Sequence, residues 1–296
     1  MLNNIIKKIK SSFKKFSVVK TVVFLVFAAY ALLLLVPYIF GFLVSLKTDE
    51  EYYSQLITAL PNSFNLKNYV RAWTDLGSAE NGLSVPTMLL NSLWYSVGTC
   101  VFSLLFSSMC AYVVSKYDFK AKGFIYGFAI VTMIIPIMGA LPSQLKFAIM
   151  VGSYNSPLYA ILNAPVLGTT FVVLYSVFKG VSWEYAEAAF IDGAGHFTVF
   201  FTIMLPQVLS PLCALFLTNF IWLWADSETP MIFFDELPPI ALGLYRYKQV
   251  VDSNDPNGSI PTFYAGLLLC MIPSLTLFAI FQNTLMDIQM GGGLKG

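Results

Sequence analysis

The chain has 296 residues, of which 57% are hydrophobic, 16% aromatic and only 11% charged. A soluble domain carries about 25% charged residues, so this composition excludes a protein that is water-soluble throughout and indicates an integral membrane protein. The net charge of +1 leaves no basic surface of the kind that nucleic-acid binding requires.

The N-terminal segment, residues 1–20, is basic and amphipathic. Apolar residues recur at helical spacing over residues 2–16, and five lysines occupy the rest of the helix surface. A helix of this kind suits the surface of an anionic membrane leaflet. A secretory signal peptide is the alternative, because an apolar run follows the basic residues. That run, residues 21–46, is longer than the core of a signal peptide and is predicted to be the first membrane span.

Five further apolar runs have a length close to the ~20 residues that a bilayer requires. They predict an all-α integral membrane domain with six transmembrane helices over residues 21–285. Polar segments separate the runs, and the longest of these are 47–86, 179–207 and 234–261. Spans two to six are predicted at 88–114, 124–141, 158–178, 209–233 and 263–285.

The distribution of positive charge predicts the orientation of these spans. If the N-terminus is cytoplasmic, the inside segments hold eleven Lys and Arg residues and the outside segments hold six. Cytoplasmic segments carry the excess of positive charge in membrane proteins. Both termini and the loop 179–207 are therefore predicted to be cytoplasmic, whereas segments 47–86 and 234–261 are predicted to lie outside.

The loop 179–207 has the pattern of a helix, a turn and a second helix. Ser182 is a suitable N-cap for a short helix over Trp183 to Asp192. Gly193 supplies the left-handed residue that ends such a helix. A second helical piece follows, with apolar residues at three- and four-residue spacing, and ends at Pro206. The predicted loop is apolar on one side and acidic at its tip, which is the form of a docking element.

Two features of the first helix in this loop favour docking. Ala186, Ala188 and Ala189 keep part of its surface thin, so another protein could approach its backbone closely. Asp192 lies at the carbonyl end of the helix, where the helix dipole disfavours an anion. Its presence there indicates that something outside this helix requires it. The alternative is that Asp192 and Gly193 are simply a favourable pair for a turn.

Span five carries polar side chains in its outer half, at Asn219, Trp222, Trp224, Asp226 and Glu228. Charged groups facing lipid are expensive, so these residues are candidates for a substrate pathway. An amide and aromatic surfaces together suit a sugar, which has hydroxyl groups and an apolar ring face. The alternative places the tryptophans in the interfacial aromatic belt and the acids among the outer headgroups.

The stretch from Glu187 to Pro206 resembles the cytoplasmic signature loop of binding-protein-dependent ABC importer permeases. The resemblance implies that the loop inserts into a groove of a separate ATP-hydrolysing subunit and transmits its opening and closing. One departure is Thr202, where relatives often carry Arg. The residues at the family spacing are Glu187, Ala188, Ala189, Asp192, Gly193, Ala194, Phe200, Ile203, Leu205 and Pro206.

The C-terminal segment, residues 286–296, resembles the glycine-rich tail of carbohydrate-importer permeases. The resemblance implies a cytoplasmic tail that contacts the ATPase subunits. Met290 and Gly291 depart from the residues that relatives more often show there, and a flexible chain end is the alternative. The residues implied in the contact are Gln289, Gly293, Leu294 and Lys295.

Taken along nearly the whole chain, the resemblance implies the type I ABC importer permease fold, with a cytoplasmic coupling helix between spans four and five. It also implies a location in the bacterial plasma (inner) membrane and a sugar or oligosaccharide as the substrate. The implied partners are a second permease subunit, two cytoplasmic ATPase subunits that bind ATP and magnesium, an external solute-binding protein and membrane lipid.

No catalytic or metal site is predicted in the chain itself, and no cofactor. No GxxxxGK[ST] motif occurs, so ATP hydrolysis has to reside in another subunit. His196 is the only histidine, and the four cysteines have no metal-ligand spacing. Three alternatives stay open: an ion-coupled secondary transporter, a membrane-embedded enzyme, and an ABC permease for a solute other than a sugar.

Overall fold

A computed structural model of the chain describes residues 18–292, apart from 57, 79–82, 136–138 and 254. The predicted amphipathic helix over 2–16 lies outside these residues. Every regular element in the described part is helical. In chain order the elements are α2 (Val18–Ser45), α3 (Asp49–Ser54), α4 (Lys67–Ser78), α5 (Val85–Leu93), the π-helix η1 (Trp94–Gly98), α6 (Thr99–Lys116), α7 (Lys122–Ile134), α8 (Leu141–Met150), α9 (Tyr159–Leu162), α10 (Thr169–Gly180), α11 (Glu184–Ile191), α12 (His196–Thr198), the π-helix η2 (Val199–Met204), α13 (Leu205–Gln207), α14 (Leu209–Trp224), α15 (Glu228–Phe233), α16 (Ile240–Asp252) and α17 (Ile260–Gly292).

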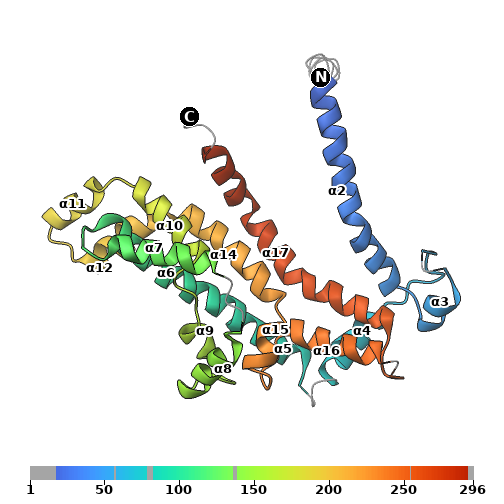
Figure 1. Cartoon of the computed structure of the whole chain (residues 1–296). Helices are drawn as coiled ribbons and strands as arrows, with labels where there is room; N and C mark the ends of the chain where they lie inside the picture. The colour runs from blue at the N-terminus through green and yellow to red at the C-terminus, as the bar shows by residue number, and fades with distance from the viewer. Residues whose placement is uncertain (1–17, 57, 79–82, 136–138, 254, 293–296) are drawn as a thin grey trace.

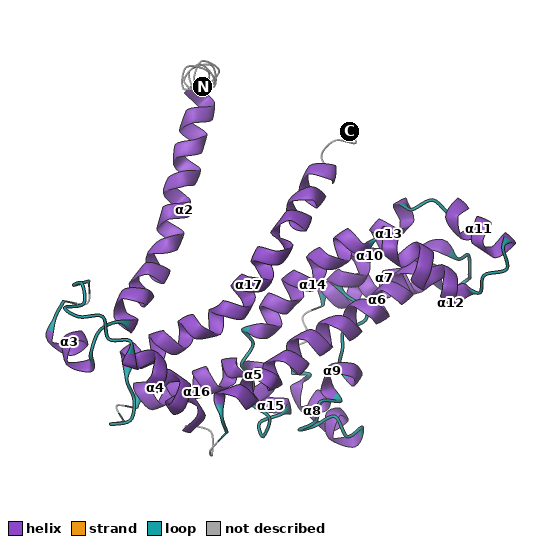
Figure 2. Cartoon of the chain, turned by 180° about the vertical axis from the view of Figure 1, so that it is seen from behind, coloured by secondary structure: helices purple, strands orange, loops and turns teal. Residues whose placement is uncertain are grey.

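Three helices among the described residues are long and apolar enough to cross a membrane: α2, the continuous rod formed by α5, η1 and α6, and α17. A fourth candidate joins the segment His196–Gln207 to α14, with a bend of 78° at the break. The helix α2 corresponds to predicted span one, the rod of α5, η1 and α6 to span two, and α17 to span six. The bent pair that includes α14 corresponds to span five. The start of α2 and the end of α17 lie on the same side of the molecule (Figures 1 and 2).

The prediction of one unbroken helix over 158–178 is wrong. Here α9 ends at Leu162, and α10 begins only at Thr169. Pro165 lies between them and has no backbone N–H with which to continue a helix. The third predicted span, 124–141, also ends early, because α7 stops at Ile134. The next residue precedes a proline and adopts an extended conformation, as steric contact with the proline ring favours.

Span five, predicted as continuous over 209–233, is likewise divided. Its first part, α14, ends at Trp224, and a short turn leads into α15. The carboxyl group of Asp226 accepts hydrogen bonds from the backbone N–H groups of Glu228 (3.0 Å) and Thr229 (3.2 Å). It thereby satisfies donors at the start of α15, so the polar residue that marks this site also interrupts the helix.

The central helix of the bundle is α6, which contacts α7, α10 and α14. Large apolar side chains fill the space between these helices, and packing of this kind holds membrane helices together through van der Waals contact. By contrast, α2 packs its last turns against α17 but leaves the apolar surface of residues 19–39 uncovered, as surfaces that face lipid or another subunit do. The largest buried residues near α6 are Tyr112, Phe171, Leu174, Phe178 and Phe200.

The two segments predicted to lie outside pack against each other and against the start of α17. The carboxyl group of Asp49, at the start of α3, accepts a hydrogen bond from the Ser259 hydroxyl (2.6 Å). Its other oxygen accepts from Arg71 on α4 (3.1 Å). Figure 1 shows α3, α4 and α16 at the end of the molecule opposite the start of α2. The helices α3, α4 and α16 therefore form one unit with the start of α17 at a single end of the bundle.

Candidate coupling loop and cavity

The loop after α10 contains the helix α11, which begins one residue later than predicted, at Glu184. The hydroxyl of Ser182 accepts a hydrogen bond from the Glu184 backbone N–H (3.3 Å), so it satisfies one of the free donors at the helix start. At the other end, Gly193 has a φ of +84°. The N–H of Ala194 bonds to the Ala189 carbonyl, and the N–H of Gly193 bonds to the Phe190 carbonyl. This pair of bonds is the Schellman motif that a left-handed residue permits, and it confirms the predicted helix end.

The small side chains of α11 do not all face outward as predicted. Ala186 and Ala189 are buried against the chain's own core, beside Phe178 and Phe200, and only Ala188 is exposed. Small residues here let α11 lie close to its own helices, so two of the three alanines are assigned to internal packing. The exposed surface of α11 is formed by Ala188 together with larger residues, and the exposed Asp192 follows the helix directly. The larger residues are Glu184, Tyr185, Glu187 and Ile191.

An aromatic cluster connects this loop to the end of α6. The ring of Tyr117 lies 5.5 Å from that of Trp183 and 5.8 Å from that of His196, between ring centroids. Phe190 on α11 lies 5.0 Å from His196. Lys116, the last residue of α6, donates a hydrogen bond to the Val181 carbonyl at the start of the loop. Both ends of the loop are thus attached to one end of α6.

The second helical piece is present, but a π-helical stretch, η2, takes up most of it. Ile203 and Leu205 are half-buried against the core, and Pro206 is exposed in the first turn of α13. The chain then bends by 78° into α14. In the tail, Gln289 lies within the last turns of α17, which continues past the predicted end of span six. Gly293, Leu294 and Lys295 lie outside the described residues.

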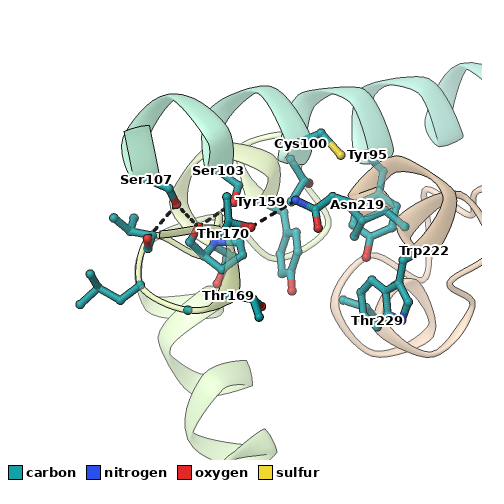
Figure 3. Close-up of a pocket in the computed structure, with 17 residues that line it drawn as sticks. Tyr95, Cys100, Ser103, Ser107, Tyr159, Thr169, Thr170, Asn219, Trp222 and Thr229 are labelled. Carbon is teal, nitrogen blue, oxygen red and sulfur yellow. Dashed lines mark hydrogen bonds between the residues drawn. The ribbon is translucent and has the colours of Figure 1, made fainter. Parts of the chain in front are cut away.

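A cavity of about 350 Å³ lies between η1, α6, α14 and the break that separates α9 from α10 (Figure 3). This volume falls within the range, on the order of 300–1,000 Å³, of small-ligand sites. Its polar lining is dominated by hydroxyl and amide groups. The hydroxyl-bearing residues are Tyr95, Thr99, Ser103, Ser107, Tyr159, Thr169, Thr170 and Thr229, and the amides are Asn163 and Asn219.

Two serines of α6 hold the helix break in place. The hydroxyl of Ser103 donates to the Pro165 carbonyl (2.7 Å), and that of Ser107 donates to the Val166 carbonyl (2.7 Å). A carbonyl in a broken helix has lost its helical partner, and inside a membrane such a group has to be satisfied by protein. The break between α9 and α10 is therefore stabilised by side chains of α6, and it forms one wall of the cavity.

The candidate pathway residues of span five occupy three different places. Asn219 and Trp222 line the cavity, and the amide of Asn219 donates to the Thr170 hydroxyl (3.4 Å). Asp226 does not line the cavity itself but accepts a hydrogen bond from the hydroxyl of Tyr95, which does (2.7 Å). Trp224 is buried elsewhere, and its indole N–H donates to the Cys270 carbonyl on α17 (2.9 Å). We therefore assign Trp224 to packing between α14 and α17.

Sequence inspection missed the cavity residues outside span five. Thr99, Ser103 and Ser107 recur every fourth residue within an apolar run, so they share one face of α6. A stripe of hydroxyl groups at this spacing is a signal that could have located the wall of the cavity. Across the described residues, no three His, Cys, Asp or Glu side chains gather as a metal site would require.

The family model described as "Binding-protein-dependent transport system inner membrane component" matches residues 103–286. The chain is similar to the diacetylchitobiose uptake system permease protein NgcG of Streptomyces coelicolor, with 26% identity over 86% of this chain and 82% of the relative. It is also 26% identical to the arabinooligosaccharides transport system permease protein AraQ of Halalkalibacterium halodurans, over 91% of this chain and 94% of that one.

Among solved structures, a bacterial ABC transporter involved in the import of the acidic polysaccharide alginate shares the fold. Its chain superposes with a TM-score of 0.71 and 21% identity, covering 90% of this chain and 98% of that one. The match of the family model over more than half of the sequence carries the assignment. This chain belongs to the family of binding-protein-dependent transport system inner membrane components, which are ABC transporter permeases and not the catalytic subunits.

Proposed function

We propose that the chain is one of two membrane-spanning subunits of an ATP-driven importer for a sugar or oligosaccharide. Its partners are a second permease, two cytoplasmic ATPases that bind ATP and magnesium, and an external solute-binding protein. It crosses the bacterial plasma membrane six times, with α7 and the pair α9 and α10 as the two shorter spans. Residues 1–20, the loop 179–207 and the tail 286–296 face the cytoplasm.

The observation that carries this proposal is that α6 contacts both the loop and the cavity. Tyr117, directly after α6, belongs to the aromatic cluster that holds the loop. Ser103, on the same helix, holds the cavity wall. These residues are separated by about 20 Å of helix, at ~1.5 Å per residue. A helix of this length with packed neighbours is stiff, so a displacement at the loop reaches the cavity.

The mechanism follows from this arrangement. Closure of the ATPase pair pushes on the exposed surface of α11, around Glu187 and Ile191. The aromatic cluster passes the displacement to α6 and α10, which move relative to α14. Since the cavity lies between these helices, its walls separate toward the outside and close again after ATP hydrolysis. Packed helix interfaces support such motion because they switch between discrete arrangements.

The chemistry of the cavity and the names of the relatives support a sugar as the substrate. Hydroxyl and amide groups can exchange hydrogen bonds with sugar hydroxyls, and the ring of Trp222 offers a surface for the apolar face of a sugar. NgcG and AraQ are both named as oligosaccharide permeases. The proposal is tested by purifying the complex, reconstituting it in liposomes and measuring ATP-dependent uptake of labelled oligosaccharides. Uptake by the chain alone, driven by an ion gradient, would instead identify a secondary transporter.

A further inference from the structure

We propose that the cavity binds an uncharged sugar unit and rejects anionic sugars such as uronates and sugar phosphates. This inference rests on the proposed function, and it names the substrate class of the same site. Of the described residues, 17 line the cavity, and none of them carries a charge. A buried anion that finds no cation loses its hydration without compensation, so a lining of this kind disfavours it strongly.

The carboxyl group behind the lining adds to this discrimination. Asp226 accepts hydrogen bonds at both of its oxygens, from the Tyr95 hydroxyl on one and from the backbone N–H groups of Glu228 and Thr229 on the other. A carboxylate can only accept hydrogen bonds, and this arrangement satisfies both of its oxygens. Because Tyr95 itself lines the cavity, the negative charge lies close to any bound ligand and repels an anion.

A hydroxyl group without a partner indicates where the ligand binds. Thr99 lines the cavity and is 5% exposed, and its Oγ1 atom has no hydrogen-bond partner among the described residues. Leaving a buried hydroxyl unsatisfied is unfavourable, so such a group in a binding cavity requires an explanation. We infer that a sugar hydroxyl reaches this atom when the cavity wall adjusts to the bound ligand, and that it supplies the missing partner.

Aromatic surfaces complete the site. Trp222 and Tyr159 both line the cavity and come from different parts of the chain, α14 and α9 (Figure 3). Aromatic faces attract cations and apolar C–H groups but not anions, because their quadrupole is negative at the face. The aromatic faces, the hydroxyl groups and the absence of charge in the lining therefore favour the same ligand, an uncharged sugar.

The test measures equilibrium binding to the assembled permease and ATPase complex without the solute-binding protein, so that the selectivity of that protein does not contribute. Labelled diacetylchitobiose, arabinobiose, cellobiose and raffinose are the neutral probes. Each probe that binds is compared with its uronate or phosphorylated analogue. We expect at least one neutral sugar to bind. Its anionic analogue should have an affinity at least about tenfold lower. Binding of none of the neutral sugars, or equal binding of the anionic analogue, would overturn the inference.

A matched pair of variants tests the role of the unpaired hydroxyl. Thr99→Val keeps the side-chain shape, and we expect it to weaken sugar binding by about three- to tenfold, as the loss of one hydrogen bond does. The melting temperature should stay the same or rise, because no internal hydrogen bond is lost. Thr218→Val is the control, since the Thr218 hydroxyl is exposed and bonds to the Ala214 carbonyl of its own helix. Unchanged sugar affinity in Thr99→Val would contradict the site.

Uptake measurements separate the two proposals. If the complex imports a neutral sugar with ATP but binds the anionic analogue equally well, the selectivity inference fails and the importer function stands. If no oligosaccharide enters with ATP, the proposed function itself fails.

Discussion

The hydroxyl of Tyr117 lies 2.8 Å from Nδ1 of His196, so a hydrogen bond joins the residue after α6 to the first residue of α12. Between these two residues along the chain lie α7 to α11, yet the contact closes them into one unit. The bond therefore fixes the far end of the coupling loop to the same helix that holds the cavity wall. His196 is exposed, and this hydrogen bond holds its side chain in place.

We predict that Tyr117→Phe weakens the coupling between ATP hydrolysis and transport. The variant keeps the ring and removes the hydroxyl, which bonds to His196 at 2.8 Å and makes a longer contact of 3.4 Å with the Tyr112 hydroxyl. The shorter bond is worth about 1 kcal/mol. Sugar uptake per ATP hydrolysed should fall about fivefold, while the ATPase rate remains. Tyr154→Phe, at an exposed tyrosine near α8, is the control and should behave as the native chain does. If Tyr117→Phe imports as much sugar per ATP hydrolysed as the native chain, the contact does not contribute to coupling.

Reversing the charge at Glu187 should prevent docking of the ATPase. Glu187 is exposed on α11, so Glu187→Lys changes the docking surface without disturbing the core. Placing a cation near the positive end of the helix dipole costs only about 0.3–1 kcal/mol. We expect normal insertion into the membrane, loss of the ATPase subunits during purification and no uptake. Glu236→Lys alters an equally exposed acid near α16 and should retain the ATPases. Full uptake by the reconstituted Glu187→Lys complex would count against the docking surface.

A pair of glycines tests whether the shape of the loop matters. Gly193 has a φ of +84°, whereas Gly195 has an ordinary φ of −75°, and a Cβ at either position would meet no atom within 4 Å. Gly193→Ala should therefore strain the loop by roughly 1–2 kcal/mol through backbone conformation alone. We expect Gly193→Ala to lower ATPase binding severalfold and Gly195→Ala to leave it unchanged. Similar affinities of the two variants would contradict a rigid docking shape.

The two tryptophans of span five should respond differently to truncation. Trp222 is 68% exposed and lines the cavity, so Trp222→Ala should weaken sugar binding at nearly constant stability. Trp224 is buried, and Trp224→Ala should destabilise the protein by about 3–5 kcal/mol through the cavity it leaves. Thermal unfolding and sugar binding, measured on both variants, check this division. Equal loss of stability in the two would refute the assignment of Trp222 to the substrate site.

The local form of the coupling loop could be predicted because it depends on neighbouring residues. Gly193 after Asp192 encodes a left-handed helix end whatever surrounds it. The direction in which α11 faces could not be predicted in this way. Ala186 and Ala189 turn inward because α10 and η2 pack on that side, and this depends on contacts between distant segments.

The helix breaks could not be predicted from hydropathy, because one proline changes the mean hydropathy of an apolar run very little. Pro165 is visible in the sequence, but the hydropathy of 158–178 stays high across it, so the run appears continuous. The different positions of the two tryptophans on α14, by contrast, could have been predicted from helix geometry. Residues two positions apart point about 200° from each other on a helix, so Trp222 and Trp224 cannot line the same cavity.

The central claim is that the exposed tip of α11 transmits force from a cytoplasmic ATPase, and crosslinking tests it most directly. A photoreactive residue in place of Ile191, which is 86% exposed, is introduced into the chain and activated in the purified complex. We predict that mass spectrometry identifies a crosslink to the ATPase subunit. A crosslink to the external binding protein would contradict the account.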